Sequence, residues 1–167
     1  MLNKGIKTIT TEDIRWLRCD IKSLNLLGAV LANQKAHASG CDEAILHRDG
    51  TVTECSSSDI FIVKDGTIFT HPTNHFILNG ITRQAVIQLA VKSGIKVMER
   101  PFTLDELFTS DEVFASSTTL EVMPVIQIDN KTIGNGSPGQ LTKKLQELFS
   151  EAIPSSALDL EKKEEFI

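Results

Sequence analysis

Lys22 is the side chain whose type and place in the sequence could do chemistry most directly. It follows a β-branched run from Ile6 to Ile14, which predicts a strand, and precedes a helical pattern that starts near Ser23. A lysine fixed at the edge of a sheet and partly desolvated loses its proton more readily and can attack aldehydes. From this stretch alone, the favoured interpretation is an ordinary solvated surface lysine.

The histidines and cysteines do not predict a metal site. His71 and His75 have i, i+4 spacing, but Pro72 lies between them in a segment that predicts a loop, so they should not share a helix face. The cysteines are odd in number, widely spaced and without a CxxC pair. This pattern favours reduced thiols in a cytoplasmic protein over a disulfide framework or a zinc site.

Length and composition indicate one ordinary globular domain. The chain has 167 residues, of which 41% are hydrophobic and 23% charged. Its net charge of -5 and the lack of a basic patch argue against nucleic acid as a partner. No apolar run approaches the length of a membrane span, and the N-terminus has no signal-peptide pattern.

Helical spacing and capping residues predict four helices. They are expected from about Leu24 to Ala38 with Gly40 as stop, from an N-cap at Thr82 to Gly94, from a Thr103/Glu106 capping box through Phe108, and from Leu141 to Ile153 before Pro154. The charge-rich tail, residues 155–167, is expected to be disordered.

Two Asp-Gly turns flanked by β-rich runs strongly predict hairpins, at Asp49-Gly50 and Asp65-Gly66. The predicted strands are Ile6–Ile14, Glu43–His47, Thr51–Glu54, Asp59–Lys64, Thr67–His71, Ile95–Met98, Asp111–Ser116, Val122–Ile128 and Lys131–Ile133. Hairpins and strand–helix–strand passages both occur, so the expected fold class is α/β with a mixed sheet.

Four motifs stand in a fixed order along the chain. They are Arg18-Cys19-Asp20-Ile21-Lys22-Ser23-Leu24-Asn25, Thr51-Val52-Thr53-Glu54-Cys55-Ser56-Ser57-Ser58, Leu78-Asn79-Gly80-Ile81-Thr82-Arg83 and Ser116-Ser117-Thr118-Thr119-Leu120-Glu121. Together they resemble the class IV (fold type IV) pyridoxal-phosphate aminotransferases, and most closely those members that act on D-amino acids. The resemblance runs from about Lys4 to about Ile153. It implies that residues 1–154 form the large, cofactor-binding C-terminal domain, with a partly barrel-like mixed sheet and flanking helices, and that the small N-terminal domain is absent.

The resemblance implies roles for two reactive side chains. Lys22 would hold pyridoxal phosphate covalently and then move a proton as general acid and base. Glu54 would pair with the pyridine nitrogen, and Arg15 would orient Glu54. Without the resemblance, Glu54 would be interpreted as an exposed carboxylate at a strand end, and Arg15 as a surface arginine.

The remaining implied contacts surround the ring and the phosphate. Leu78 would lie against the ring, and Ser56 and Ser57 would line the adjoining loop. Phosphate would bind the amides of Ile81 and Thr82 with the Thr82 hydroxyl, at a helix N-terminus, and also Ser117 and Thr118. The alternatives are a plain N-cap for Thr82 and an ordinary strand-end turn for Ser117 and Thr118. No metal is expected.

The implied activity is transamination between a D-amino acid, such as D-alanine, and a 2-oxo acid, in a homodimer. We expect it to be impaired here, because without the small domain water enters and substrate is poorly positioned. Cys55 also stands where many relatives have glycine. The alternatives are an aminodeoxychorismate lyase-like enzyme, a branched-chain aminotransferase, and a non-catalytic domain that self-associates through its open apolar face.

Overall fold

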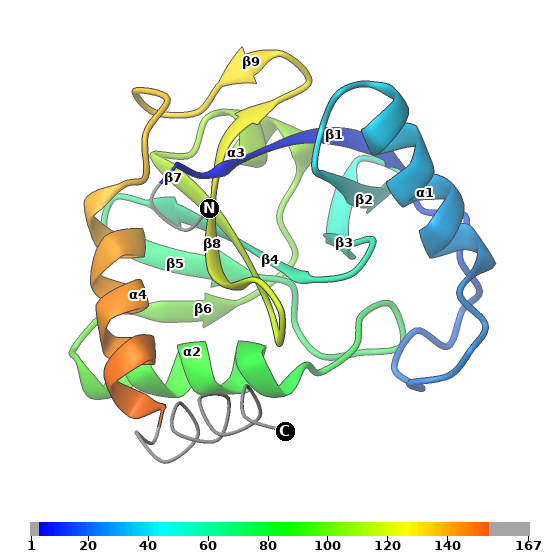
Figure 1. The fold of residues 1–167 in the computed structure, drawn as a ribbon. Coiled ribbons are helices and arrows are strands. Elements are labelled where there is room, and N and C mark those ends of the chain that lie inside the picture. The colour runs from blue at the N-terminus through cyan, green and yellow to red at the C-terminus, as the bar shows by residue number, and fades with distance from the viewer. Residues whose placement is uncertain (1–3, 154–167) are drawn as a thin grey trace, which may run out of the picture.

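The computed structural model describes residues 4–153, and these residues build one curled sheet with helices around it (Figure 1). The strands are hydrogen-bonded in the order β3-β2-β1-β8-β7-β4-β5-β6, and β9 pairs with β8. Their bounds are β1 Ile6–Glu12, β2 Glu43–Arg48, β3 Thr51–Cys55, β4 Asp59–Lys64, β5 Thr67–Thr70, β6 Val97–Glu99, β7 Glu112–Ser117, β8 Glu121–Ile128 and β9 Lys131–Thr132.

The sheet is mixed, as the sequence predicts. β1 is parallel to β2 and β8, and β5 is parallel to β6, while β2–β3, β4–β5, β4–β7 and β7–β8 are antiparallel. Both Asp-Gly hairpins are present, with Asp49 and Gly50 at φ 49° and 78°, and Asp65 and Gly66 at φ 48° and 71°. Positive φ at both central residues gives the turn a twist that matches paired strands.

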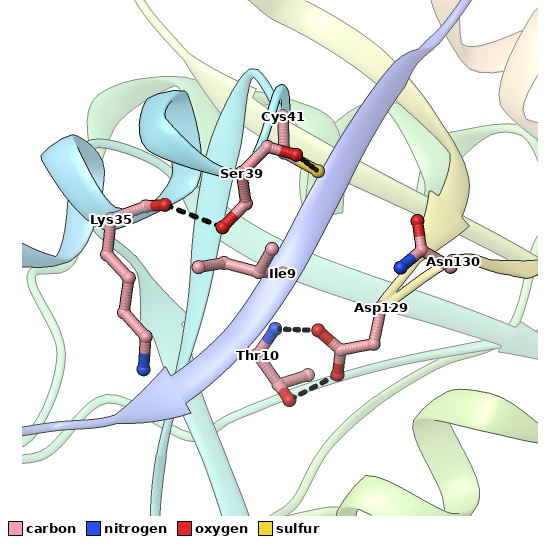
Figure 2. A pocket seen from close by; sticks show the side chains of 7 residues that line it. All are labelled: Ile9, Thr10, Lys35, Ser39, Cys41, Asp129 and Asn130. Carbon is pink, nitrogen blue, oxygen red and sulfur yellow. Dashed lines mark hydrogen bonds between the residues drawn. The ribbon is translucent and has the colours of Figure 1, made fainter.

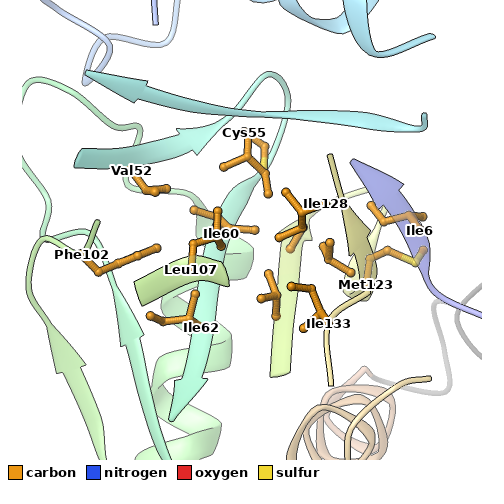
Figure 3. Close-up of a cluster of buried hydrophobic side chains, with 14 residues drawn as sticks. Ile6, Val52, Cys55, Ile60, Ile62, Phe102, Leu107, Met123, Ile128 and Ile133 are labelled. Atoms are coloured by element: carbon orange, nitrogen blue, oxygen red, sulfur yellow. The ribbon is translucent and has the colours of Figure 1, made fainter. Parts of the chain in front are cut away.

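The curl brings β3 and β4 onto the same core as β1, β7 and β8. This core contains, among other residues, Ile6, Val52, Ile60, Val113 and Ile128, all less than 5% exposed (Figure 3). Burial of these branched side chains is the main force that closes the sheet. The expectation of a partly barrel-like mixed sheet is therefore confirmed.

Four helices cover the sheet in the part of the chain that the model describes. α2 (Ile81–Lys92) and α4 (Gln140–Ala152) lie together on one side, and their apolar residues share a core with Phe61 and Phe114 (Figure 1). α1 (Leu27–Ala38) lies over β1 and β2. α3 (Leu104–Phe108) begins with the predicted capping box of Thr103 and Glu106.

Two element boundaries differ from the prediction and matter for the site. β1 ends at Glu12 and α1 begins at Leu27, so Lys22 lies in an irregular segment, residues 13–26, rather than directly between a strand and a helix. The strand stops because the Asp13 carboxylate accepts the backbone N–H of Arg15 at 3.1 Å, which turns the chain. The N-cap of α2 is Gly80, not Thr82, because the Gly80 carbonyl already accepts the Gln84 N–H at 3.0 Å.

The apolar stripe of α1 faces outward. Its small residues Ala29, Ala32 and Ala36 are buried against the sheet, whereas the larger residues that gave the helical pattern are uncovered. Large exposed apolar side chains run through residues 14–31: Ile14, Trp16, Leu17, Ile21, Leu24, Leu26, Leu27, Val30 and Leu31. We call this set the exposed apolar stretch.

The tail expected to be disordered, residues 155–167, lies outside the described residues. Within residues 4–153, no helix combines the length and apolarity that a membrane crossing requires.

Candidate functional site

Glu54 and Arg15 form the centre of the candidate site. Glu54 is the last residue but one of β3 and is 7% exposed, and its Oε1 accepts a hydrogen bond from Arg15 Nη1. Its other oxygen, Oε2, accepts the backbone N–H of Leu78 at 3.0 Å. Burial raises the pKa of Glu54 above its ordinary value, although Arg15 acts in the opposite direction. The predicted pairing of Arg15 with Glu54 is present.

Asp13 holds the opposite side of the Arg15 guanidinium. Arg15 Nε and Nη2 donate to Asp13 Oδ1 and Oδ2, both at 2.9 Å, and the Asp13 side chain has no exposed surface. Burial acts to raise the pKa of Asp13, but the bonds and charge of Arg15 outweigh it and hold that pKa below its usual value. The Arg15 guanidinium donates two bonds to Asp13 and one to Glu54. Arg48 also lowers the pKa of Asp13, whereas the charge of Asp13 raises that of Glu54, so the two pKa values shift in opposite directions.

Arg48 and Thr53 complete this cluster. Arg48 Nε and Thr53 Oγ1 each donate to Asp13 Oδ2 at 3.1 Å. Arg48 Nη2 also donates to the carbonyls of Arg15 and Trp16, at 3.0 and 3.2 Å. Asp13, Glu54, Arg15 and Arg48 therefore form a quartet with no net charge, an arrangement that lowers the cost of burying ionised groups.

Two hydrogen bonds to backbone carbonyls join the segment that carries Lys22 to the loop that carries Leu78. The Cys19 N–H donates to the His75 carbonyl at 2.9 Å, and Arg15 Nη2 donates to the Phe76 carbonyl at 3.2 Å. Leu78 is half-buried. Lys22 itself is exposed, and it forms neither a hydrogen bond nor an ion pair with residues 4–153. The structure thus places its segment beside Glu54 and leaves the amine in solvent.

The predicted serines have a partner that the sequence did not reveal. Ser57 Oγ donates to Glu43 Oε2 at 2.7 Å, and Ser56 donates to Glu43 Oε1 through both its amide and its hydroxyl. Ser58 Oγ also donates to Glu43 Oε2, at 3.3 Å. Glu43 is only 2% exposed. These hydroxyls therefore fix the loop after Glu54.

The N-terminus of α2 is the predicted phosphate site. Its N-cap is Gly80, and no side chain among residues 4–153 caps the helix. Ile81 is 84% exposed there, whereas Thr82 is buried. The loop also packs closely, because a Cβ atom at Gly80 would lie 2.5 Å from Asp59 Oδ2.

Asp59 joins this helix end to the predicted Ser117–Thr118 pair. Asp59 is aligned with Ser116 across β4 and β7, so Ser117, the last residue of β7, is at the same end of the sheet. Ser117 Oγ accepts the Leu120 N–H at 3.1 Å, as in an ordinary turn, and Thr118 is exposed. Burial, with the charge of Glu54, raises the pKa of Asp59 to about 8, and Arg83 acts against it.

A separate open pocket lies elsewhere, between β1, the end of α1 and the β8–β9 turn (Figure 2). Thr10 and Asp129 occupy one side and bind each other through two hydrogen bonds, 2.8 Å and 2.5 Å long. None of the predicted site residues lines this pocket. Residues 4–153 also contain no cluster of potential metal ligands.

Sequence reasoning missed Asp13, Arg48, Glu43 and Asp59. The Asp13-x-Arg15 spacing resembles Arg18-x-Asp20 in the same segment, yet only the first pair is buried. No local signal separates the two. Glu43 is the first residue of a predicted buried strand, a place where an ionisable residue needs partners, and that was an available signal.

Comparison with known proteins supplies the family. A model of "Amino-transferase class IV" matches residues 3–128. D-alanine aminotransferase of Listeria monocytogenes serotype 4b (strain F2365) is 53% identical over 95% of this chain and 55% of its own length, and that of Bacillus licheniformis is 52% identical over 90% of this chain and 53% of its own. The chain thus spans about half the length of the curated relatives it matches.

Solved structures agree. The branched-chain amino acid aminotransferase of Thermobaculum terrenum, in its PLP form, has a TM-score of 0.84 and 31% identity, covering 89% of this chain and 51% of that one. The Escherichia coli branched-chain amino acid aminotransferase has a TM-score of 0.81 and 33% identity, covering 90% of this chain and 53% of that one. With a family model matching most of its length, the chain belongs to the class IV aminotransferases.

Proposed function

We propose that this chain is the pyridoxal-phosphate-binding half of an enzyme that transfers an amino group between a D-amino acid, such as D-alanine, and a 2-oxo acid. The supporting observation is the buried Glu54, held by Arg15 and the Leu78 amide beside the segment that carries Lys22. Identity of 50–53% to D-alanine aminotransferases, against 31–36% to branched-chain enzymes, supports the D-amino acid over the branched-chain alternative.

The residues present fit pyridoxal phosphate. Bound to a lysine, this cofactor withdraws electrons from the Cα atom of an amino acid. Glu54 would face the pyridine nitrogen and hold a proton there, and Leu78 would pack on the ring. The first-turn amides of α2, at Ile81 and Thr82, are available to a phosphate, together with Ser117 and Thr118.

Lys22 would attach the cofactor and then move a proton at the substrate Cα. Its exposure means that residues 4–153 do not by themselves exclude water from the amine. A proton on a solvated amine exchanges with bulk water, so we expect transamination by this chain alone to be slow. Ser56 and Ser57 would act by fixing the loop beside Glu54, through Glu43.

The exposed apolar stretch supports a homodimer as the assembled state. Nine large apolar side chains within residues 14–31 are exposed, and apolar surface of this kind is typical of protein–protein contacts. The three free thiols agree with the expected reducing, cytoplasmic location.

Titration of the purified chain with pyridoxal phosphate, followed by borohydride reduction and peptide mapping, tests this proposal. We expect a new absorbance band and a single labelled peptide that contains Lys22. Lys92→Ala, an exposed lysine on α2, is the matched control and should leave labelling unchanged. Labels scattered over surface lysines in the wild type and in Lys22→Ala alike would refute the cofactor site.

Product analysis separates the candidate reactions. The cofactor-loaded chain is assayed first alone and then together with a purified small domain of a relative. D-alanine with a 2-oxo acid acceptor should yield pyruvate and a D-amino acid. Pyruvate formed from aminodeoxychorismate without any acceptor would favour the lyase-like alternative. A dimer that binds no cofactor would favour the non-catalytic one.

A further inference from the structure

We propose that Asp13 is a positioning residue of the candidate active site, which fixes the Arg15 guanidinium so that Arg15 holds Glu54 in place. This inference rests on the proposed function, because Glu54 matters only if it faces the cofactor. Neither the four motifs nor the predicted roles include Asp13. The argument begins with its contacts.

The Asp13 carboxylate accepts five hydrogen bonds. Arg15 supplies three, from its amide at 3.1 Å and from Nε and Nη2 at 2.9 Å, and Arg48 Nε and Thr53 Oγ1 supply two more at 3.1 Å. The Asp13 N–H is itself bound to the His47 carbonyl at 2.8 Å. A carboxylate with every lone pair engaged and a bound backbone is a rigid support for the fork of an arginine.

Glu54 cannot orient Arg15 by itself. It takes a single N–H from Arg15, whereas Asp13 takes two in the planar, fork-to-fork arrangement that fixes a guanidinium. The other side of Arg15 is closed by α1, because a Cβ atom at Gly28 would lie 3.0 Å from Arg15 Cγ. Asp13 and α1 therefore fix the place from which Arg15 reaches Glu54.

Asp13→Asn is the sharpest variant. An amide has one oxygen, so its NH2 group must face some of the donors of Arg15, Arg48 or Thr53, and the fork to Arg15 breaks. The matched control is Asp20→Asn, the same chemical change in an exposed pair, Arg18–Asp20, on the same segment.

The first readout needs no cofactor. Carbon-13 NMR of the Glu54 carboxyl, assigned by its loss in Glu54→Gln, gives the pKa of Glu54 in the full chain. The charged and titratable groups that act on Glu54 are Arg15, Asp13, Cys19, Cys55 and Asp59, so the sign of the change in its pKa is informative.

If Asp13 positions Arg15, Asp13→Asn weakens the hold of Arg15 and the pKa of Glu54 rises by about one unit. If Asp13 were only a nearby negative charge, its removal would lower that pKa. A fall, or a value equal to that of Asp20→Asn, overturns the proposal.

A double-mutant cycle on cofactor affinity provides the second readout. We expect Asp13→Asn to weaken pyridoxal phosphate binding roughly tenfold, the order of one charge-assisted hydrogen bond. In the Glu54→Gln background it should cause no further loss, since Asp13 acts through Glu54. Equal losses in both backgrounds would overturn the proposal.

The two readouts separate the two ideas. If Glu54→Gln binds the cofactor as tightly as the wild type, the proposed role of Glu54 is refuted. If the pKa of Glu54 still rises in Asp13→Asn, the positioning of Glu54 through Asp13 is retained. If Asp13→Asn does not fold, Arg15→Lys tests the same link, because lysine keeps the charge but cannot form the fork. An unchanged pKa of Glu54 in Arg15→Lys overturns the proposal.

Discussion

Glu54 and Lys22 are the two side chains with proposed chemical roles, and their surroundings are opposite. Glu54 is 7% exposed, and its two oxygens accept hydrogen bonds from Arg15 and from the Leu78 amide. Asp13 binds Arg15 in turn and is paired with Arg48. Lys22 is exposed, in an irregular segment, without a partner among residues 4–153. The described residues therefore fix the acid that would tune the cofactor ring, and they leave the amine that would bind the cofactor exposed to solvent.

The largest test of this contrast is the free energy of unfolding. Arg15→Ala leaves the Asp13 and Glu54 carboxylates buried without their shared cation, which should cost about 3–5 kcal/mol. Lys22→Ala should change stability by no more than roughly 0.5 kcal/mol, as for a surface residue. Urea denaturation of both variants measures this difference. Equal losses would mean that Lys22 has partners that the structure does not show.

The loop after Glu54 gives a second, smaller effect. Glu43→Gln removes a carboxylate that binds Ser56, Ser57 and Ser58, so it should cost about 2 kcal/mol and loosen the loop. Hydrogen exchange at the Ser56 amide should become faster while exchange in α4 stays unchanged. Unaltered exchange at Ser56 would show that the bond from its N–H to the Ala44 carbonyl, 2.9 Å long, holds this position without Glu43.

Gly28→Ala is expected to lower the free energy of unfolding by less than the two changes above. Whether it stabilises or destabilises depends on whether Arg15 can move. Alanine for glycine within a helix normally stabilises by about 1 kcal/mol. Here the new Cβ would lie 3.1 Å from the Arg15 Cα atom, which Asp13 holds in place, so we expect a net loss of about 1 kcal/mol. Combination with Arg15→Ala is the control. A stabilised single variant would show that the Arg15 segment can shift.

The last expected effect is the pH dependence of stability, and it has the opposite sign because the substitution stabilises the chain. Because the pKa of Asp59 is raised to about 8 in the folded chain, the folded state binds a proton that the unfolded state releases. The contribution of Asp59 is fully present below its unfolded pKa and is lost as the pH rises towards about 8. Asp59→Asn should therefore match the wild type near pH 4 and exceed its stability at pH 8 by at least about 1 kcal/mol. Thermal melting at both pH values measures the difference in stability between Asp59→Asn and the wild type. An equal difference at both pH values would contradict the raised pKa of Asp59.

The sequence predicted what depends on local chemistry. The two Asp-Gly hairpins and the Thr103/Glu106 capping box are present as predicted, since each is specified by a few adjacent residues. The predicted N-cap of α2 was wrong because Thr82 and Gly80 both fit the local pattern. The N-cap is Gly80 because its carbonyl accepts the first helical hydrogen bond.

The site was predictable only where the family resemblance reached. Arg15 and Glu54 are paired as expected, but Asp13 could not be told from Asp20, because the two have the same spacing to an arginine. What separates them is the packing of Arg48 and Thr53 around Asp13, from strands more than 30 residues away in sequence. Such contacts depend on the register of β1 against β2.

The irregular segment from 13 to 26 has a consequence for proteolysis. It presents Arg18 and Lys22 in an exposed, non-helical stretch, which is the form of substrate that a trypsin-like protease cleaves after basic residues. Arg15 and Arg48 lie in the same part of the molecule, yet their buried ion pairs should protect them. A cofactor attached to Lys22 would block cleavage after Lys22 and leave the cleavage site after Arg18 open. Limited digestion would then distinguish loaded from unloaded chains by their fragments, without any measurement of catalysis.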